Sequence, residues 1–186
     1  MVAQKLTGNT KPTKKALSKI ARKKERLKRQ LWPDLDSSRL WDRQKSAGWL
    51  SVPRAMPLIL RIVDMLSEKG KPVSSTYLDL WCRTFDDSFI IVTNPHEMAY
   101  YAGFTGERAQ STWATRMRIL ERLEFIATKE GSIPMNYVLL FNPYQVIKRH
   151  REEGSVGDVA YTLLLQRMLD IGADDLDDAG DASPSG

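Results

Sequence analysis

The chain has 186 residues, of which 42% are hydrophobic, and carries a formal net charge of +5. This length accommodates one ordinary domain with tails, and the apolar fraction is sufficient for a packed core. No stretch approaches the ~20 apolar residues of a membrane span, and the first residues lack the apolar run of a signal peptide. We therefore expect no membrane partner and no export.

Charge is concentrated at the two ends of the sequence. Residues 1–30 contain eleven Lys/Arg and one acid, Glu25, whereas residues 174–186 contain five Asp and no base, which leaves residues 31–173 neutral. We expect residues 1–36 to form a partly disordered basic arm and residues 174–186 an acidic, disordered tail. Attraction to polyanions should then come largely from the arm.

The first predicted elements are a basic helix and a tryptophan-rich lead-in. Residues 12–31 favour helix and carry a thin apolar stripe. Asp36 could cap a short helix, and Trp32, Trp41 and Trp49 predict that the lead-in packs on the core.

Helical and strand patterns then alternate. Residues 57–69 predict a helix stopped by Gly70, and Ser74 or Ser75 is expected to cap the next helix, in which Cys82 is expected as a small core residue. The single cysteine excludes an internal disulfide and fits a reducing cytoplasm. Residues 89–93 are β-branched and aromatic, which predicts a short strand. This strand could pair with the hairpin predicted later in the chain to make a small sheet.

The most informative segment spans residues 94–141. Residues 94–104 predict a short helix that ends at a glycine turn, residues 105–108 open a long helix to about Leu123, and residues 125–129 and 137–141 predict two strands. This order is typical of a winged helix-turn-helix, whose second helix enters the DNA major groove. The fold class expected is mainly α with a small antiparallel β-sheet.

Asn94 followed by Pro95 is a favourable helix start, with asparagine as the cap and proline at the first helical position, and Asn142 followed by Pro143 repeats it. The last predicted helix begins at Ser155, with Asp158 three residues later as in a capping box, and runs to about Ile171. It either completes the core or forms the seam of a homodimer. The expected organisation is the arm (1–36), a winged-helix domain with its lead-in (37–150), the C-terminal helix (151–173) and the tail.

The long helix divides into two faces when residues 106–123 are projected at ~100° per residue. The apolar face carries Ala109, Trp113, Met117, Leu120 and Leu123. On the opposite face we expect base contacts from Arg108, Gln110, Ser111 and Thr115, and backbone contacts from Arg118 and Arg122. A solvated amphipathic helix is the alternative. Arg116 projects toward the apolar side and is expected to pair with Asp79, Asp86 or Asp87.

Residues 116–126, Arg-Met-Arg-Ile-Leu-Glu-Arg-Leu-Glu-Phe-Ile, resemble the junction between helix and wing in bacterial winged-helix proteins, commonly Leu-x-x-Leu-Gly-Phe-Ile. The resemblance covers residues 55–147. Plasmid replication initiators and regulators of mobile elements use related modules. Because Glu124 replaces the usual glycine, we expect a less tight exit turn. The resemblance implies a wing contact with a minor groove or phosphates, for which the chain offers Lys129, with Ser132 and Asn136.

Two further basic segments are candidates for phosphate contact. The first segment is the arm, whose candidate residues are Lys14, Lys15, Arg22, Lys23, Lys24 and Arg26. The second segment, Lys148 to Arg151, is either a solvated helix end or a phosphate contact. The acidic tail could fold back on the arm as a mimic of DNA.

No catalytic constellation is present: two distant histidines and one cysteine give no zinc spacing, and no phosphate-binding glycine loop occurs. We expect no enzyme, metal or cofactor. The sequence predicts a cytoplasmic, nucleoid-associated protein that binds double-stranded DNA in transcriptional regulation, or in replication or maintenance of a genetic element. The alternative is a winged-helix interaction module that docks on a protein while its arm holds RNA or DNA non-specifically.

Overall fold

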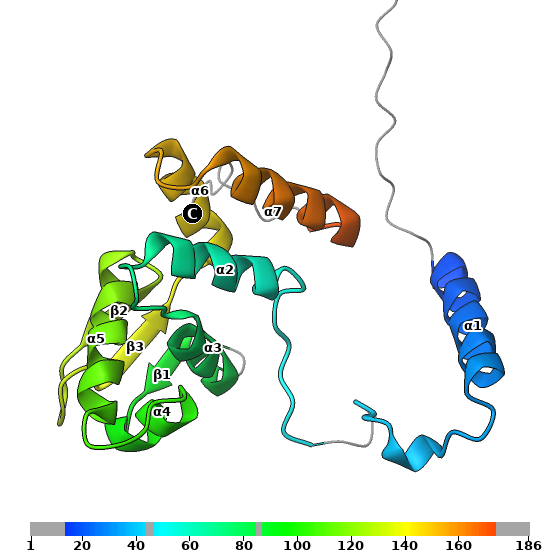
Figure 1. The fold of residues 1–186 in the computed structure, drawn as a ribbon, viewed down its shortest axis with the longest axis horizontal. Helices are drawn as coiled ribbons and strands as arrows, with labels where there is room; N and C mark the ends of the chain where they lie inside the picture. The colour runs from blue at the N-terminus through cyan, green and yellow to red at the C-terminus, as the bar shows by residue number, and fades with distance from the viewer. Residues whose placement is uncertain (1–13, 44–46, 85–86, 174–186) are drawn as a thin grey trace, which may run out of the picture. The chain divides into compact units, whose positions relative to one another are not determined.

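The computed structural model describes residues 14–43, 47–84 and 87–173 and divides the chain into two units, Met1–Trp49 and Leu50–Gly186 (Figure 1). The described part is mainly helical with one small antiparallel sheet, as the sequence predicts. The first unit takes in residues 37–49, which the sequence pattern grouped with the following domain. None of the described helices combines the length and apolar character that crossing a membrane requires.

The first unit contains the predicted basic helix, α1 (Lys14–Leu31), and a short 3₁₀ helix, η1 (Ser37–Arg39). Glu25 lies within reach of Lys28 (2.7 Å) and Arg29 (3.3 Å), which relieves part of the repulsion among the cations of α1. Asp36 accepts the backbone N–H of Ser38 at 2.9 Å and so caps η1 as expected.

The three tryptophans of this unit were expected to pack on the core, and this prediction was wrong. Trp32, Trp41 and Trp49 are 58%, 70% and 39% exposed. The guanidinium of Arg43 lies 3.9 Å from the centre of the Trp49 ring, so a cation–π contact covers one of these indoles.

Four helices of the second unit form a group centred on α2 (Met56–Leu66): α2 itself, α3 (Ser74–Arg83), α6 (Pro143–Glu152) and α7 (Asp158–Ile171). Helix α2 packs against the other three. The start of α3 corrects a prediction, because neither Ser74 nor Ser75 caps it. The cap comes from α2 instead, where Asp64 accepts the backbone N–H groups of Val73 (2.7 Å) and Ser74 (2.8 Å).

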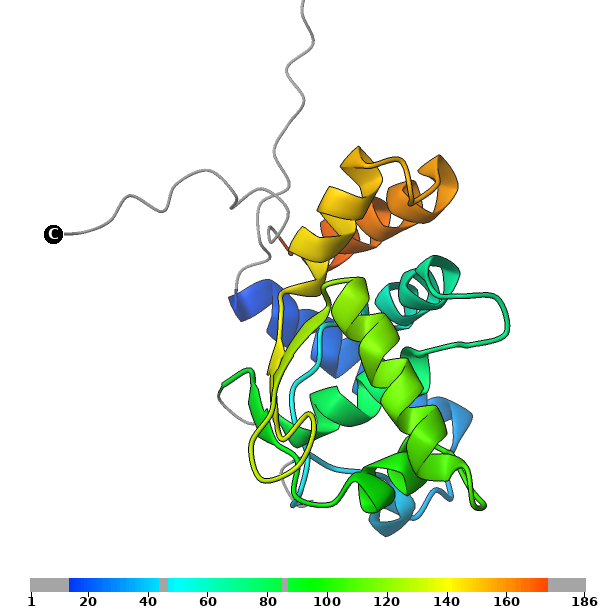
Figure 2. The same ribbon diagram turned by 90° about the vertical axis from the view of Figure 1, so that its left-hand side faces the viewer.

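The remaining elements are β1 (Phe89–Ile91), α4 (Pro95–Tyr101), α5 (Ala109–Arg122), β2 (Ile126–Lys129) and β3 (Tyr137–Leu140). The strands form an antiparallel sheet in the order β1-β3-β2, with Ile90 opposite Val138 and Thr128 opposite Val138 on its other side. The predicted pairing of the first strand with the later hairpin is therefore confirmed. Figure 2 looks onto α5, with α4 and the β2–β3 hairpin beside it.

The core of the second unit lies between the helices and the inner face of this sheet. Its largest fully buried side chains include Trp113, Tyr77 and Phe125. The rings of Tyr77 and Phe125 meet edge to face at 5.5 Å. Cys82 is exposed on α3, so its assignment to the core was wrong; partial burial, followed by the charge of Asp79, raises the pKa of its thiol.

Helix α7 completes this core through Leu164 and Met168, which are buried. The capping box predicted at Ser155 is not formed, because the helix begins at Asp158 with Gly157 as its cap residue. Asp158 is instead paired with Arg151 of α6. The pairing fixes the turn between the two helices and leaves Asp158 no role as a cap.

Candidate nucleic-acid interface

The turn between α4 and α5 is built from local capping interactions. Asn94 caps α4 by accepting the backbone N–H groups of His96 and Glu97. Gly103, at φ +89°, ends the helix, and the Phe104 N–H donates to the Ala99 carbonyl at 2.9 Å. A backbone in this left-handed region favours glycine, which explains why the sequence marks the turn clearly.

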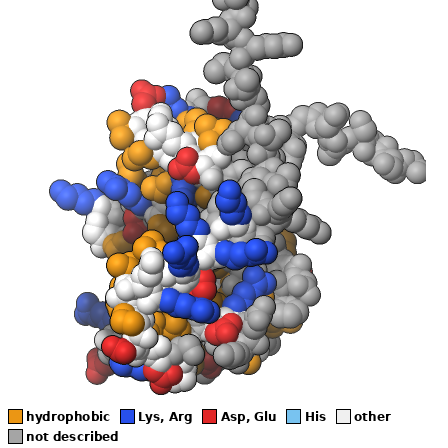
Figure 3. All heavy atoms as spheres, turned by 90° about the vertical axis from the view of Figure 1, so that its right-hand side faces the viewer, with side chains coloured by type: hydrophobic (Ala, Val, Ile, Leu, Met, Phe, Trp, Pro, Cys, Tyr) orange, Lys and Arg blue, Asp and Glu red, His pale blue; other side chains and the backbone are white. Residues whose placement is uncertain are grey.

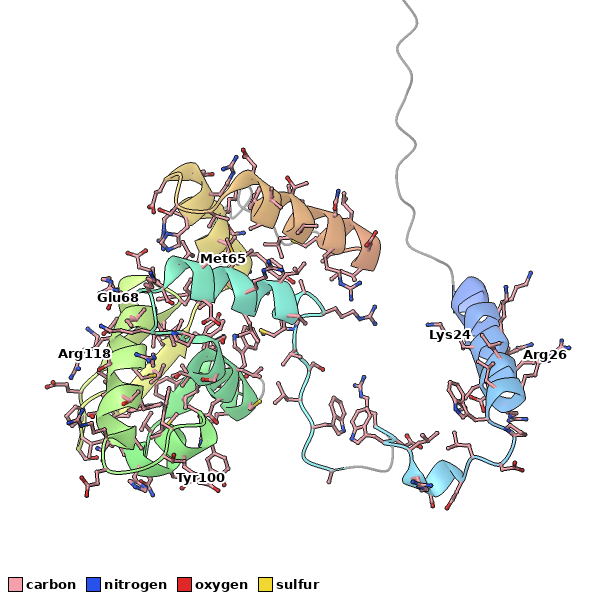
Figure 4. The ribbon with its side chains drawn as sticks, viewed as in Figure 1. Lys24, Arg26, Met65, Glu68, Tyr100 and Arg118 are labelled. Carbon is pink, nitrogen blue, oxygen red and sulfur yellow. The ribbon has the colours of Figure 1, made fainter. Side chains whose placement is uncertain are left out.

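Helix α5 has the two faces that the projection predicts. Ala109, Trp113, Met117 and Leu120 are buried, and Leu123 is partly buried. Ile119 is buried as well, which the projection did not assign to the core. Among the predicted contact residues, Arg108, Gln110, Ser111, Arg118 and Arg122 are exposed and Thr115 is half-buried. Arg118 points away from the core in Figure 4.

The two hydroxyl groups on the outer face of α5 already have partners. Ser111 Oγ donates to the Arg108 carbonyl at 2.9 Å, and Thr115 Oγ1 donates to the Ser111 carbonyl at 2.9 Å. A hydroxyl in this arrangement keeps its acceptor lone pairs but must rotate before it can donate to a ligand. These residues are therefore better placed to accept a hydrogen bond than to give one.

The last arginine of α5 is held by an acid that follows α2. Arg122 Nη2 lies 2.7 Å from Glu68 Oε1, and Lys71 pairs with the other oxygen of the same carboxylate at 2.5 Å. The hydrogen bond from Lys71, and then that from Arg122, holds the pKa of Glu68 below its usual range. Arg122 is thus exposed as predicted, but a phosphate would have to compete with Glu68 for it.

Arg116 forms no ion pair with Asp79 or Asp87, the two expected partners that lie in the described part of the chain. Within the described residues Asp79 pairs with Arg83 at 3.0 Å, and Asp86 lies outside them. The guanidinium of Arg116 lies instead 5.8 Å from the centre of the Phe104 ring. The contact links α5 to the turn through a cation–π interaction.

The exit turn of α5 corrects the expectation drawn from Glu124. This residue adopts φ +58°, the left-handed conformation that a glycine would take. Its N–H donates to the Glu121 carbonyl (2.9 Å), and the Phe125 N–H donates to the Leu120 carbonyl (3.0 Å), as in a Schellman motif. The turn is therefore as tight as in the glycine pattern. The Glu124 carboxylate pairs with Arg149.

The β2–β3 hairpin, the predicted wing, is tied directly to α5, the predicted recognition helix. Glu121 of α5 accepts both the backbone N–H (2.9 Å) and the hydroxyl (2.7 Å) of Thr128 in β2. Because the Thr128 N–H points to the outer edge of the sheet, this carboxylate also occupies the open edge of β2. The sequence pattern did not predict this role for Glu121. The one sequence feature that pointed to this contact was the place of Glu121 near the end of the predicted helix, seven residues before Thr128 of the predicted strand.

The exposed part of the wing offers few cations. Lys129 is exposed, as is Ser132, but Asn136 is 6% exposed and was wrongly placed at the tip. Its side chain donates to the Val92 carbonyl (2.7 Å) and accepts the Ser132 N–H (3.1 Å). Asn136 therefore shapes the loop between β2 and β3.

The basic segment from Lys148 to Arg151 is engaged within the protein. Arg149 pairs with Glu124, and Arg151 pairs with Asp158 and donates to the Val156 carbonyl. His150 lies 2.9 Å from the Leu123 carbonyl and stacks on Phe125. These contacts connect α6 to the end of α5, so the segment is neither a purely solvated helix end nor an open phosphate site.

The cations of the arm lie along α1. Arg22, Lys23, Lys24 and Arg26 are exposed, and Lys and Arg side chains crowd together over this helix in Figure 3. Lys14 and Lys15 belong to α1, but their side chains lie outside the described residues, as does the whole acidic tail.

Within the ranges that the structure covers, no group of three His, Cys, Asp or Glu side chains could hold a metal ion. Comparisons of the chain with protein-family models, with curated proteins and with solved structures found no match. The site is therefore defined by its own geometry: a helix with a buried flank and an open cationic flank, followed by a tethered hairpin.

Proposed function

We propose that the chain binds double-stranded DNA as a winged helix-turn-helix protein, in transcriptional regulation or in replication or maintenance of a bacterial genetic element. Helix α5 is the recognition helix. Arg108, Gln110, Ser111 and Thr115 contact bases and Arg118 contacts the backbone. Lys129 of the wing and the cations of α1 supply further phosphate contacts.

The arrangement of elements supports this assignment. From α3 onward the order is helix, strand, helix, helix, strand, strand, and the first strand joins the hairpin to give the order β1-β3-β2. A helix-turn-helix places its second helix in the major groove. Here that helix is α5, and the turn before it and the hairpin after it are both fixed by specific hydrogen bonds.

One observation carries the proposal: α5 buries Trp113 and Met117 while Arg108 and Arg118 remain exposed. The indole and the thioether anchor the helix in the core, so its orientation is fixed before any ligand binds. The guanidinium groups are left on the solvent side, where arginine can bridge guanine O6 and N7 or bind a phosphate. Neither arginine has an ion-pair partner among the described residues.

The distribution of charge assigns the arm a separate role. Residues 31–173 are neutral, so the folded part alone provides little long-range attraction for DNA. If the arm neutralises about six phosphates, raising the salt concentration from ~50 to ~200 mM lowers affinity by roughly three decades. The arm thus provides salt-sensitive affinity, and α5 provides the sequence preference.

The test compares two double variants that lose the same charge. Arg108→Ala with Arg118→Ala removes the open cations of α5, whereas Arg61→Ala with Arg167→Ala removes two exposed cations from α2 and α7. Binding is measured by fluorescence anisotropy on a duplex selected from a random library, with circular dichroism as the check on folding. A base-contacting arginine such as Arg108 contributes about 1–3 kcal/mol, and loss of the Arg118 phosphate contact adds to this, so the α5 variant should bind at least tenfold more weakly than the control.

Equal affinity of the two double variants would contradict the assignment of α5. Loss of a protein partner with unchanged duplex binding would favour an interaction module. Deleting residues 1–30 should flatten the salt dependence, and an unchanged slope would remove the arm from the interface.

A further inference from the structure

The outer face of the sheet is apolar and exposed. Antiparallel register places Phe89 beside Leu139 and Ile91 beside Tyr137, with all four side chains on the face that points away from the core. Phe141 continues the same face just beyond β3. The rings of Phe89 and Tyr137 stack at 6.0 Å with an angle of 15° between their planes.

The exposure of these side chains is substantial. Phe89 is 41% exposed, Ile91 56%, Tyr137 37%, Leu139 46% and Phe141 42%. An antiparallel sheet with one face in water normally alternates apolar residues inside with polar residues outside. Here the outer positions of β1 and β3 are as apolar as the inner ones, so the pattern of a solvated face is absent from both strands.

We infer that this sheet face is the interface between two copies of the chain, which pack sheet against sheet about a two-fold axis. In such an interface the same patch meets itself, so the patch must be its own complement. An apolar patch meets this condition, whereas a patch of one charge sign would repel its copy. Among the strand residues that the structure describes, Lys129 is the one charged side chain on this face, and it lies at the end of β2.

The area agrees with what a dimer needs. At roughly 200 Å² for a large side chain, the five exposed fractions leave about 450 Å² of apolar surface per copy, within the roughly 300–600 Å² of the largest patch on a typical monomer, which is often functional. Two copies would bury about 900 Å² from these side chains alone, and the surrounding rim brings the total above the ~1,000 Å² of a specific interface. Three of the five side chains are aromatic, which is typical of interface cores.

Helix α7 is the competing surface. Val159 is 76% exposed and Leu163 43%, and with Met65 of α2 they line a small groove of about 110 Å³. Figure 4 labels Met65 on α2, next to α7. The exposed apolar residues of α7 are divided between two sides of the helix, on either side of the flank that Leu164 and Met168 bury. The sheet face, by contrast, is one contiguous patch.

Sedimentation equilibrium of the full chain tests the inference, because the weights of monomer and dimer are directly distinguished. The unmodified chain should dimerise below ~100 μM, in the range of weak specific association. Ile91→Lys and Leu139→Lys should each raise the dimer dissociation constant at least tenfold. Val159→Lys, a more exposed apolar position on α7, is the matched control and should leave the constant unchanged.

Ile91→Thr is a milder variant, because threonine keeps the β-branched side chain that strands favour. It therefore separates a loss of dimerisation from a loss of folding. It should weaken the dimer in the same direction, with thermal melting near that of the unmodified chain. A monomer at all concentrations, face variants that dimerise normally, or disruption by Val159→Lys alone would each overturn the inference. The inference does not depend on DNA binding: the α5 double variant should still dimerise, and Ile91→Lys should still bind a duplex.

Discussion

The hydrogen bonds between Glu121 and Thr128 allow a quantitative test of how the wing is held. Replacing Glu121 with Ala removes an acceptor that receives two donors at 2.9 and 2.7 Å. Hydrogen bonds to a charged group contribute about 1.5–3 kcal/mol each, and water at the edge of the sheet recovers part of that. We expect a loss of about 2 kcal/mol in the free energy of unfolding.

Urea denaturation followed by far-UV circular dichroism measures this loss. For a chain of this size the expected change corresponds to a fall of about 4–8 °C in melting temperature. Glu121→Gln keeps an acceptor without the charge and should give an intermediate value. Glu130→Ala removes an exposed carboxylate from the same hairpin and serves as the control. If Glu121→Ala and Glu130→Ala unfold at the same midpoint, the carboxylate does not hold the wing.

Three further predictions concern the surroundings of α5 and the wing. Glu68→Gln should free Arg122 and tighten duplex binding about two- to tenfold at low salt, which fluorescence anisotropy would detect. Because the hydrogen bonds that Glu68 accepts lower its pKa, acidification below the usual glutamate range should protonate this carboxylate and break the same pair. Unchanged affinity in Glu68→Gln would argue against a phosphate contact from Arg122. Glu124→Val should lower the free energy of unfolding by about 2 kcal/mol, since a β-branched residue is strained at φ +58°. Glu124→Gly should lower it by less than about 0.5 kcal/mol, because glycine adopts this conformation without strain. Equal losses in the two variants would refute the reasoning. Gly131→Ala would place a Cβ against the Asn136 side chain, so we expect about 1–3 kcal/mol of destabilisation and faster hydrogen exchange in the hairpin, and native-like exchange would contradict it.

Local sequence signals predicted most of the secondary structure. Asn94 followed by proline, and Asn142 followed by proline, each begin a helix because the asparagine side chain caps the backbone within three residues. The face of α5 that carries Trp113 followed from helical periodicity alone. Signals of this kind act over one or two turns of helix, so they can be read without knowing how the chain folds.

Long-range partners were beyond the sequence. Asp64 caps a helix that begins ten residues later, and Glu68 pairs with Arg122 from 54 positions away. No local pattern announces such a pair, because its partners meet only when α2 packs on its neighbours. The same holds for Asn136, whose polar side chain suggested the surface but whose hydrogen bond to the Val92 carbonyl requires burial.

By itself, the sequence determined which segments form helices and strands, which flank of α5 is apolar, and that the cations are concentrated at one end of the chain. Only the tertiary structure decided that Glu124 adopts the conformation of a glycine, that Glu121 fastens the wing, and that the outer positions of the sheet form one apolar patch. The physical reason is that periodicity and capping are properties of adjacent residues. Strand register, edge protection and ion pairing are instead set by which segments the folded core brings together.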